Sequence, residues 1–299
     1  MDRLKGIEVV IVVAEEGGFA PAAKRLGMSP PAVTRTVLAL EEHLGIRLFR
    51  RTTRVVRLTE SGERYIAGGR RVLDELAEAE ASASGAHKGL KGQVAVTAPG
   101  MFGRLFVAPI ALDFLALHPD ISLRTLFVDR ITDLVEEGLD VAVRIGHLPD
   151  SSLVATQVGL MRQVVCASPS YLASHGVPRA PNDLEGMEGI DFSFSAPQRH
   201  WAFRSSGRSR AVRPRSRLSV NSAEVAVAAA VAGRGVARLL AYQVEAEVRA
   251  GRLEIVLADF EPPPLPVHVL HVEGRHAAAR VRAFVGMMVE RLRSEDWLS

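Results

Sequence analysis

The sequence predicts two kinds of fold in one chain: an N-terminal all-α winged helix-turn-helix, followed by a C-terminal α/β domain with two lobes. The first prediction depends on two short helical patterns around a glycine-containing turn, with a run of arginines after them, in residues 19–57. The second depends on short strands that alternate with helices across residues 93–292. With 299 residues and 47% hydrophobic content, the chain can bury the cores of two or three domains.

The excess positive charge is concentrated at the N-terminal end. Residues 1–60 carry ten Lys and Arg against seven Asp and Glu, whereas the remaining 239 residues carry 27 of each. The formal net charge of +3 therefore comes from the segment that contains the helix-turn-helix pattern. Such a distribution is expected of a domain that contacts the phosphates of DNA.

The N-terminal domain, here called the head (residues 1–58), is predicted to contain three helices. They are expected over residues 2–16, 21–26 and 30–43. Gly27 permits the sharp turn between the second and third helices. Ser29 is a good N-cap, and Pro30 suits the first helical position because no intrahelical N–H is needed there.

The third helix is expected to have a buried face and a DNA-reading face. Its buried stripe comprises Val33, Val37, Leu40 and Leu44. Thr34 and Arg35 are best placed to reach base edges in a major groove, where an arginine can pair with guanine. The predicted DNA contacts of this segment are Ser29, Pro30, Pro31, Thr34, Arg35 and Leu38. An ordinary surface helix with an isolated arginine would show the same pattern, so both interpretations stay open on this helix alone.

An arginine cluster after the third helix favours DNA binding. Five arginines fall within 11 residues, with no acid between them: Arg47, Arg50, Arg51, Arg54 and Arg57. The segment TTRVVRL (52–58) has strand propensity and is expected to form the wing. Arg54 is expected to enter the minor groove, while Arg50, Arg51 and Thr53 contact the backbone. A charge run is often only a solvated surface, but its position beside a helix-turn-helix indicates function.

Residues 59–92 are predicted to form a linker helix and a hinge. The helix runs from after Thr59 to about Ser84, and SGAHKGLKG (84–92) follows as the hinge. Apolar and small residues alternate at spacings of four and three, which favours pairing with a second helix: Tyr65, Gly69, Val72, Leu76, Ala79 and Ala83. A dimer would double the small DNA interface of one helix-turn-helix. The alternative is that this stripe packs on its own chain.

The ordered motifs along the chain resemble those of the LysR-type transcriptional regulators. The resemblance covers essentially the full length and is strongest in AEEGGFAPAAKRLGMSPPAVTRTVLALEEHLGIRLFRRTTRVVRLTESGERY (14–65). It continues in ITDLVEEGLDVAVRIGHLPDSSLVA (131–155) and AAAVAGRGVARLLAYQVEAEVRAGRLEIVL (228–257). Pro30 and Pro31 depart from the family, many members of which carry polar residues such as Gln there.

The resemblance implies a division of labour between domains. It implies a winged helix-turn-helix that binds operator DNA, a linker helix that dimerises, and an effector-binding domain like the periplasmic solute-binding proteins. It also implies that a small-molecule effector alters DNA bending and contact with RNA polymerase. Many family members assemble as tetramers, so we expect a homodimer or a homotetramer. The single cysteine suits the reducing cytoplasm, where we expect this chain to act.

The residues of the C-terminal domain independently indicate two α/β lobes. Strands are expected near 93–98, 122–128, 140–146, 162–166, 235–240 and 268–272, with helices near 102–117, 131–137, 222–232 and 277–293. The strand–helix–strand rhythm predicts parallel sheets. EPPPLP (261–266) is expected to carry a return crossover. Lobe I then comprises about 93–163 and 268–299, and lobe II about 164–267, with a cleft between them.

The candidate effector-binding residues follow from this topology. In such sheets, ligands bind beyond the carboxyl ends of strands, and helix N-termini favour anions. The predicted contacts are Thr97, Ala98, Gly100, Met101, Arg144, Ile145, Gly146, His147, Asn221 and Ser222. Thr97 and Ser222 can instead be helix caps, and Arg144 can be a structural ion-pair partner. The expected effector is small and acidic or aromatic.

A second basic run extends from Arg199 to Arg217 and contains seven arginines and no acid. It can attract an anionic effector or contact DNA. Its Ser and Gly content and lack of periodicity favour a solvated hairpin instead. Trp201 and Phe203 alternate as on a strand and are expected to pack in lobe II.

Other classes of function find little support in the sequence. Cys166 lacks a recognisable nucleophile motif and is expected to be a buried structural thiol, and a single cysteine excludes an intrachain disulfide. His268 and His271 point to opposite faces of a strand and cannot share a metal ion. We therefore expect no catalytic residues, metal, cofactor, signal peptide or membrane span. The alternative function is a small-molecule-binding or protein-interaction module without DNA-directed activity.

Overall fold

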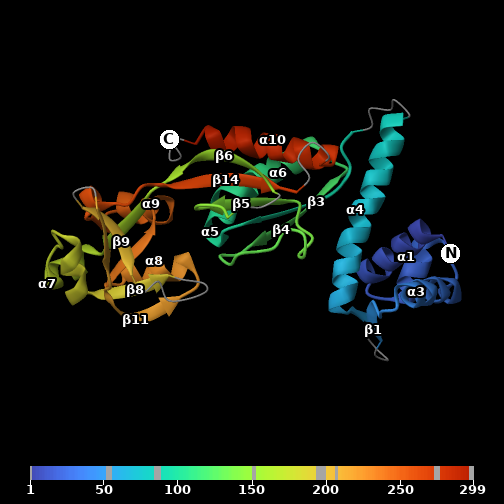
Figure 1. Cartoon of the computed structure of the whole chain (residues 1–299), viewed down its shortest axis with the longest axis horizontal. Helices are drawn as coiled ribbons and strands as arrows, with labels where there is room; N and C mark the ends of the chain where they lie inside the picture. Colours follow the sequence, from blue (N-terminus) through green and yellow to red (C-terminus); the bar gives the residue numbers. More distant parts are fainter. Residues whose placement is uncertain are drawn as a thin grey trace. The chain divides into compact units, whose positions relative to one another are not determined.

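The computed structural model describes residues 2–51, 56–83, 89–149, 153–192, 200–205, 208–272 and 277–295. The chain divides into two compact units (Figure 1). The first contains Met1–Gly92 and two short segments, Asp133–Leu139 and Ala278–Arg280. The second contains the remainder of the chain.

The first unit contains the three predicted helices, a two-stranded wing and a long helix (Figure 1). The elements are α1 (Arg3–Glu15), α2 (Phe19–Leu26), α3 (Pro30–Leu44), β1 (Phe49–Arg51), β2 (Val56–Leu58) and α4 (Glu60–Ala83). β1 and β2 pair antiparallel, with Arg50 opposite Arg57. The helices expected over 2–16, 21–26 and 30–43 are confirmed to within two residues at each end.

Local signals explain where the helices of the head begin and end. The hydroxyl of Ser29 accepts a hydrogen bond from the Ala32 N–H (3.3 Å), so the predicted N-cap of α3 is confirmed. Gly27 and Gly45 end α2 and α3 in the left-handed conformation, with φ of 63° and 66°. Of the predicted stripe, Val33, Val37 and Leu40 are buried in one core with α1 and α2, and Leu44 packs against that core while only partly buried.

The expected pairing stripe of α4 divides into two parts. Tyr65 packs against the core of the head, and Gly69 is buried where an added Cβ would lie only 2.7 Å from Ile7 of α1. Val72 and Leu76 are exposed, at 45% and 38%. The first turns of α4 therefore pack on the same chain, as the alternative interpretation held. The next turns expose apolar side chains to solvent, where a second helix could pair with them. The side chains of Ala79 and Ala83 lie outside the described residues.

Lobe I, within the second unit, contains a five-stranded mixed sheet among the described residues. Its strand order is β4 (Ile121–Phe127), β3 (Gly92–Ala98), β5 (Val141–Ile145), β14 (Leu265–His271) and β6 (Val154–Met161). A continuous helical stretch follows β3, formed by α5 (Gly100–Phe102), a π-helical turn η1 (Gly103–Val107) and α6 (Ala108–Leu117). It packs on α10 (Ala279–Arg293), where the rings of Phe114 and Phe284 lie 5.0 Å apart.

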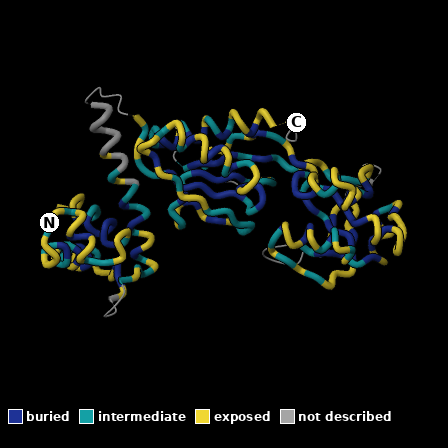
Figure 2. The backbone as a smooth tube through the Cα atoms, turned by 180° about the vertical axis from the view of Figure 1, so that it is seen from behind, coloured by how far each residue is buried: buried dark blue, intermediate teal, exposed yellow. Residues whose placement is uncertain are grey.

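Lobe II contains a second five-stranded mixed sheet among the described residues, and the central strands of both lobes are buried (Figure 2). Its order is β11 (Arg215–Val220), β8 (Glu188–Phe192), β12 (Val236–Leu240), β7 (Gln163–Ala167) and β13 (Glu254–Val256). The covering elements are α7 (Pro169–His175), η2 (Pro181–Gly186), the hairpin β9 (Trp201–Ser205) and β10 (Arg208–Val212), α8 (Ala223–Val231), α9 (Ala241–Arg249) and η3 (Ala258–Phe260). Successive side chains of β7 point to opposite faces of the sheet. Cys166 packs with α8 on one face and Val165 packs with α7 and the hairpin on the other, so lobe II has two cores.

Three expectations for this region need correction. The sheets are mixed and not parallel, because β14 runs antiparallel to β5 and β6, and β12 runs antiparallel to β7. EPPPLP is not wholly a crossover, since Leu265 and Pro266 already belong to β14. Residues 131–137 form a turn and not a helix. The Asp133 carboxylate accepts from the Val135 and Glu136 N–H groups (2.9 Å each), which closes the turn before Gly138.

The basic run of lobe II forms the expected hairpin where the structure describes it. Trp201 and Phe203 are buried in the lobe II core, as predicted, whereas Arg204 and Arg210 are exposed. The later arginines continue into the edge strand β11. Arg199 and the side chain of Arg208 lie outside the described residues.

One helical stretch among the described residues, Gly100–Leu117, is long and apolar enough to cross a membrane by length and composition alone. Core helices of globular domains also pass this test. Here Phe102, Ile110 and Phe114 are buried within lobe I.

Candidate functional site

The exposed face of α3 carries the side chains that the sequence assigned to DNA. Pro30, Pro31, Arg35 and Leu38 are exposed and Thr34 is half-buried, while Val37 on the opposite side is fully buried. Ser29 is exposed at the start of the helix, where it also serves as the N-cap. The apolar core of the head therefore holds this face of α3 toward solvent.

The wing presents two arginines side by side. Arg50 on β1 lies directly opposite Arg57 on β2, and both are exposed. Like charges in a cross-strand pair repel each other, and an anion between them would relieve that repulsion. The side chain of Arg51 lies outside the described residues, as do Thr53 and Arg54.

Two acidic side chains of the head, Glu15 and Glu16, pair with cations other than Arg35 and Arg50. Glu15 pairs with Arg25 and with Arg70 of α4 (2.9 Å each), and Glu16 pairs with Arg25 (3.0 Å). Within the described part of the head, Arg35 and Arg50 form no ion pair. Their positive charge is therefore available to an external anion such as a DNA phosphate.

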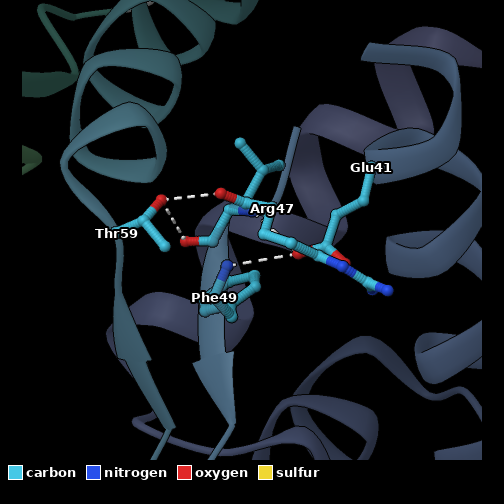
Figure 3. A network of polar contacts seen from close by, with 5 residues as sticks. Glu41, Arg47, Phe49 and Thr59 are labelled. Atoms are coloured by element: carbon cyan, nitrogen blue, oxygen red, sulfur yellow. Dashed lines mark hydrogen bonds and ion pairs between the residues drawn. The ribbon is translucent and has the colours of Figure 1, made fainter. Parts of the chain in front are cut away.

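A buried carboxylate joins α3 to the base of the wing (Figure 3). Glu41 is only 3% exposed, and it accepts from the N–H groups of Leu48 (2.8 Å) and Phe49 (3.2 Å) and from Arg47 (2.9 Å). Burial opposes its charge, but these donors outweigh burial and lower the pKa of Glu41 below its usual value. Sequence reasoning missed Glu41, because only the fold shows that this acid of α3 points inward.

A second candidate site is a cavity of about 340 Å³ that both lobes line. Lobe I supplies Pro99, Val128, Asp129, Arg130, Ile131, Arg144, Ile145 and Leu265, and lobe II supplies Gln163, Phe192, Arg238, Leu239, Leu240, Tyr242 and Gln243. The lining contains three arginines and one aspartate, and the remaining walls combine apolar side chains with Gln163, Gln243 and Tyr242. The two crossovers between the lobes are joined by a bidentate ion pair from Arg162 to Glu261 (2.8 and 2.9 Å).

The charged groups of this cavity are held by defined contacts. Arg144 donates to the backbone carbonyl (3.0 Å) and the hydroxyl of Thr132. Arg238 lies 5.6 Å from the centre of the Trp201 ring, and burial lowers its pKa to about 10. Asp129 accepts from the Gly100 N–H (3.0 Å), and burial raises its pKa. The cavity therefore contains fixed positive charge and an acid that is shifted toward its neutral form.

Two of the ten predicted effector residues, Arg144 and Ile145, line this cavity. Thr97 is fully buried and donates to the Leu126 carbonyl (2.7 Å), and Ser222 is the N-cap of α8 through the Val225 N–H (3.3 Å). The others outside the lining are Ala98, Gly100, Met101, Gly146, His147 and Asn221. Sequence reasoning missed Arg130, two residues after the predicted strand 122–128, and Arg238, within the predicted strand 235–240.

Two family models together match most of the chain. The model described as a bacterial regulatory helix-turn-helix protein of the lysR family matches residues 4–63. The model described as a LysR substrate binding domain matches residues 87–293. These ranges correspond to the segments that carry the two candidate sites.

Relatives and solved structures agree with these models. The chain is 35% identical to an HTH-type transcriptional repressor of Pseudomonas aeruginosa, over 97% of this chain and 92% of the relative. It is 31% identical to the HTH-type transcriptional activator AaeR of Escherichia coli, over 97% and 94%. The structure of CrgA, a LysR-type transcriptional regulator from Neisseria meningitidis, matches with a TM-score of 0.62 and 30% identity, over 96% of this chain and 98% of that one.

Proposed function

Because this chain belongs to the LysR family of helix-turn-helix regulators, we propose that α3 and the wing are its DNA-reading surface and that the interlobe cavity is its effector site. The chain is a DNA-binding transcriptional regulator with a small-molecule effector-binding domain. The domains we assign are the winged helix-turn-helix (1–58), the linker helix and hinge (59–92) and the effector-binding domain (93–299). It acts by binding and not by catalysis, on operator DNA in the cytoplasm.

The observation that carries the DNA assignment is the exposed cationic surface of the head. The start of α3 enters the major groove, where Arg35 and Thr34 contact base edges. Arg50 and its neighbours on the wing neutralise phosphates. The paired arginines Arg50 and Arg57 support this assignment, because a phosphate between them relieves their repulsion.

Two substitutions test this division of labour in the full-length chain. Duplexes selected from a random pool by the wild-type protein supply the specific probe, and unselected duplexes supply the non-specific one. Arg35→Ala should weaken binding to the selected duplex about 10- to 100-fold and leave random duplexes nearly unaffected, since one good base contact contributes about 1–3 kcal/mol. Arg50→Ala should weaken binding to both probes equally. Equal loss on both probes from both variants would refute the assignment.

We assign self-association to α4. Its support is the pair of apolar side chains, Val72 and Leu76, exposed on successive turns. Two heads carried by paired α4 helices would bind a site with two similar halves, as a homodimer or as part of a homotetramer. Sedimentation of the full chain tests this: Leu76→Glu should shift the protein toward monomer, and an unchanged sedimentation coefficient would contradict it.

The effector we infer is a small acidic or aromatic molecule. Arg130, Arg144 and Arg238 suit a carboxylate, and Phe192 and Leu265 suit an apolar or planar body. Binding across both lobes would favour one lobe and subunit arrangement, and so change the spacing of the DNA heads and contact with RNA polymerase. Thermal unfolding of the full chain with benzoate and small dicarboxylates tests the chemistry. Neutral amides of the same shape are the matched controls, and equal stabilisation by amides would contradict an anion site.

A further inference from the structure

The backbone of Leu48 is held from two sides at the base of the wing, between Arg47 and Phe49, which Figure 3 labels. Its N–H donates to the buried Glu41 carboxylate on α3 (2.8 Å). Its carbonyl accepts from the N–H (2.9 Å) and the hydroxyl (3.3 Å) of Thr59, immediately before α4. A single residue therefore connects the recognition helix, the first wing strand and the linker helix.

Thr59 also starts the linker helix. Its hydroxyl oxygen accepts from the Gly62 N–H (2.9 Å), which caps α4, and its proton is directed at the Arg47 carbonyl (2.7 Å). A Cβ on Gly62 would lie 2.1 Å from the Leu48 carbonyl oxygen. The first turn of α4 therefore rests on the Leu48 backbone at a distance that only glycine permits.

These contacts stabilise the head and also restrict the orientation of its helices. Both polar groups of Leu48 are fixed by partners on different helices, so α3 and α4 cannot rotate independently without breaking a buried hydrogen bond. The 24 residues of α4 span about 36 Å. A tilt of about 10° at its base moves its far end by about 6 Å, which approaches the rise of two base pairs.

We propose that Glu41, Thr59 and Gly62 are positioning residues that form a clamp on Leu48, and that this clamp sets the angle between recognition helix and linker helix on which selective DNA binding depends. The inference deepens the proposed function, because it rests on α3 being the DNA-reading element. It assigns no DNA contact to the clamp itself. The clamp contacts only residues of the head, so it affects DNA binding indirectly, through the orientation of α3.

The test compares four full-length variants, the three below and Glu41→Gln, on the duplexes selected by the wild-type protein and on random duplexes. Thr59→Ala removes the hydroxyl that caps α4 and reaches the Arg47 and Leu48 carbonyls. Thr59→Ser restores that hydroxyl. Asp2→Ala is the matched control in the same domain, since Asp2 caps α1 through the Leu4 (3.0 Å) and Lys5 (3.2 Å) N–H groups and lies outside the clamp.

Thr59→Ala should lose about tenfold or more in affinity for the selected duplex and less than about threefold for random duplexes. Thr59→Ser should bind both probes like wild type, and so should Asp2→Ala despite a lower thermal midpoint. Glu41→Gln keeps the size and an acceptor but loses the charge, and it should give an intermediate loss of selectivity. Insertion of one or two base pairs in the middle of the selected duplex should weaken wild type more than Thr59→Ala.

The proposal is overturned if Thr59→Ala binds both probes like wild type, or if it loses affinity for both in the same proportion. It is also overturned if Asp2→Ala loses selectivity to the same extent, because the effect would then be general destabilisation of the head. Failure of the proposed DNA interface can be distinguished from failure of the clamp. If the interface is wrong, Arg35→Ala and Arg50→Ala bind both probes like wild type, whatever Thr59→Ala does.

Discussion

The head and the interlobe cavity are built from contacts of different range along the chain. In the head, the groups that position the DNA-reading face are neighbours in sequence: Glu41 and Thr59 reach Leu48 across seven and 11 residues. In the effector-binding domain, Asp129 is held by Gly100 across 29 residues, and Arg162 reaches Glu261 across 99. A local site is specified by one short segment, whereas the cavity exists only once both sheets have formed.

This contrast predicts that the stability of the head depends on a few buried polar contacts. Glu41→Ala should cause the largest loss of stability, about 3 kcal/mol in the free energy of unfolding of the head, because it leaves the Leu48 and Phe49 N–H groups buried without their acceptor. Denaturant unfolding of the full-length protein, followed by a probe in the head, measures it. A loss below about 1 kcal/mol would mean that water or rearrangement replaces the carboxylate.

The same carboxylate gives a pH dependence with a definite sign. Glu41 has a lowered pKa in the folded head, so its stabilising effect is present above the unfolded-state value of about 4.3 and is lost as pH falls through the folded value. The stability of the head should therefore fall on acidification below about pH 4.3. Glu41→Gln should reduce this slope, and an unchanged slope would show that other carboxyl groups cause it.

Substitutions in the cavity should change the affinity for a ligand and not the stability of the protein. Arg144→Ala combined with Arg238→Ala should weaken the binding of a stabilising carboxylate about 100-fold or more, because each hydrogen bond to a charged group contributes about 1.5–3 kcal/mol. The measurement is calorimetric titration of the full chain with the carboxylate that gives the largest thermal shift. The salt slope of DNA affinity is the internal control, since these arginines lie outside the head. If the double variant kept the carboxylate affinity of the wild type, the effector site would have to lie outside this cavity.

The sequence predicted the head much better than the cavity, for physical reasons. Ser29 and Pro30 are local start signals, so the beginning of α3 was located to the residue, and its predicted end at residue 43 lies one residue from the observed end at Leu44. The cavity joins Pro99 to Leu265, and no local pattern brings such residues together. The helix predicted near 131–137 was wrong because Ile131, Leu134 and Val135 mimic helical spacing, while Asp133 closes a turn through the backbone.

The same limit applies to the direction of strands and to buried acids. Parallel sheets were predicted from strand–helix alternation, but β14 returns from lobe II and pairs antiparallel with both neighbours. Glu41 gave no sequence signal, since an acid on an amphipathic helix is usually exposed. These features depend on contacts that form only in the folded domain.

The reactivity of Cys166 should distinguish a buried structural thiol from a thiol on the surface. Cys166 is buried between β7, β12 and α8, and burial raises its pKa to about 12. Native protein at pH 8 should react with Ellman's reagent at least about 100-fold more slowly than unfolded protein, because the thiolate is disfavoured in the fold. Stability should also fall as pH rises above the unfolded thiol value of about 8.5. Rapid native labelling would contradict this placement.

The smallest effect is expected at the surface of the head. Arg25→Ala removes ion pairs with Glu15 and Glu16, but Arg25 is largely exposed, so solvent screens these pairs and the loss of stability should be small. Thermal unfolding at low and high salt measures the change, and the difference from wild type should shrink as salt rises. A loss comparable to that of Glu41→Ala would remove the distinction between buried and exposed polar contacts in the head.

The most direct test of the account is a salt titration of duplex affinity for the full-length protein. The account predicts a steep linear fall of log affinity with log salt, because cationic side chains displace counterions from phosphates. Arg50→Ala should reduce that slope by about one. No measurable duplex binding at low salt, with a folded and self-associated protein, would contradict the assignment of α3 and the wing as the DNA-reading surface.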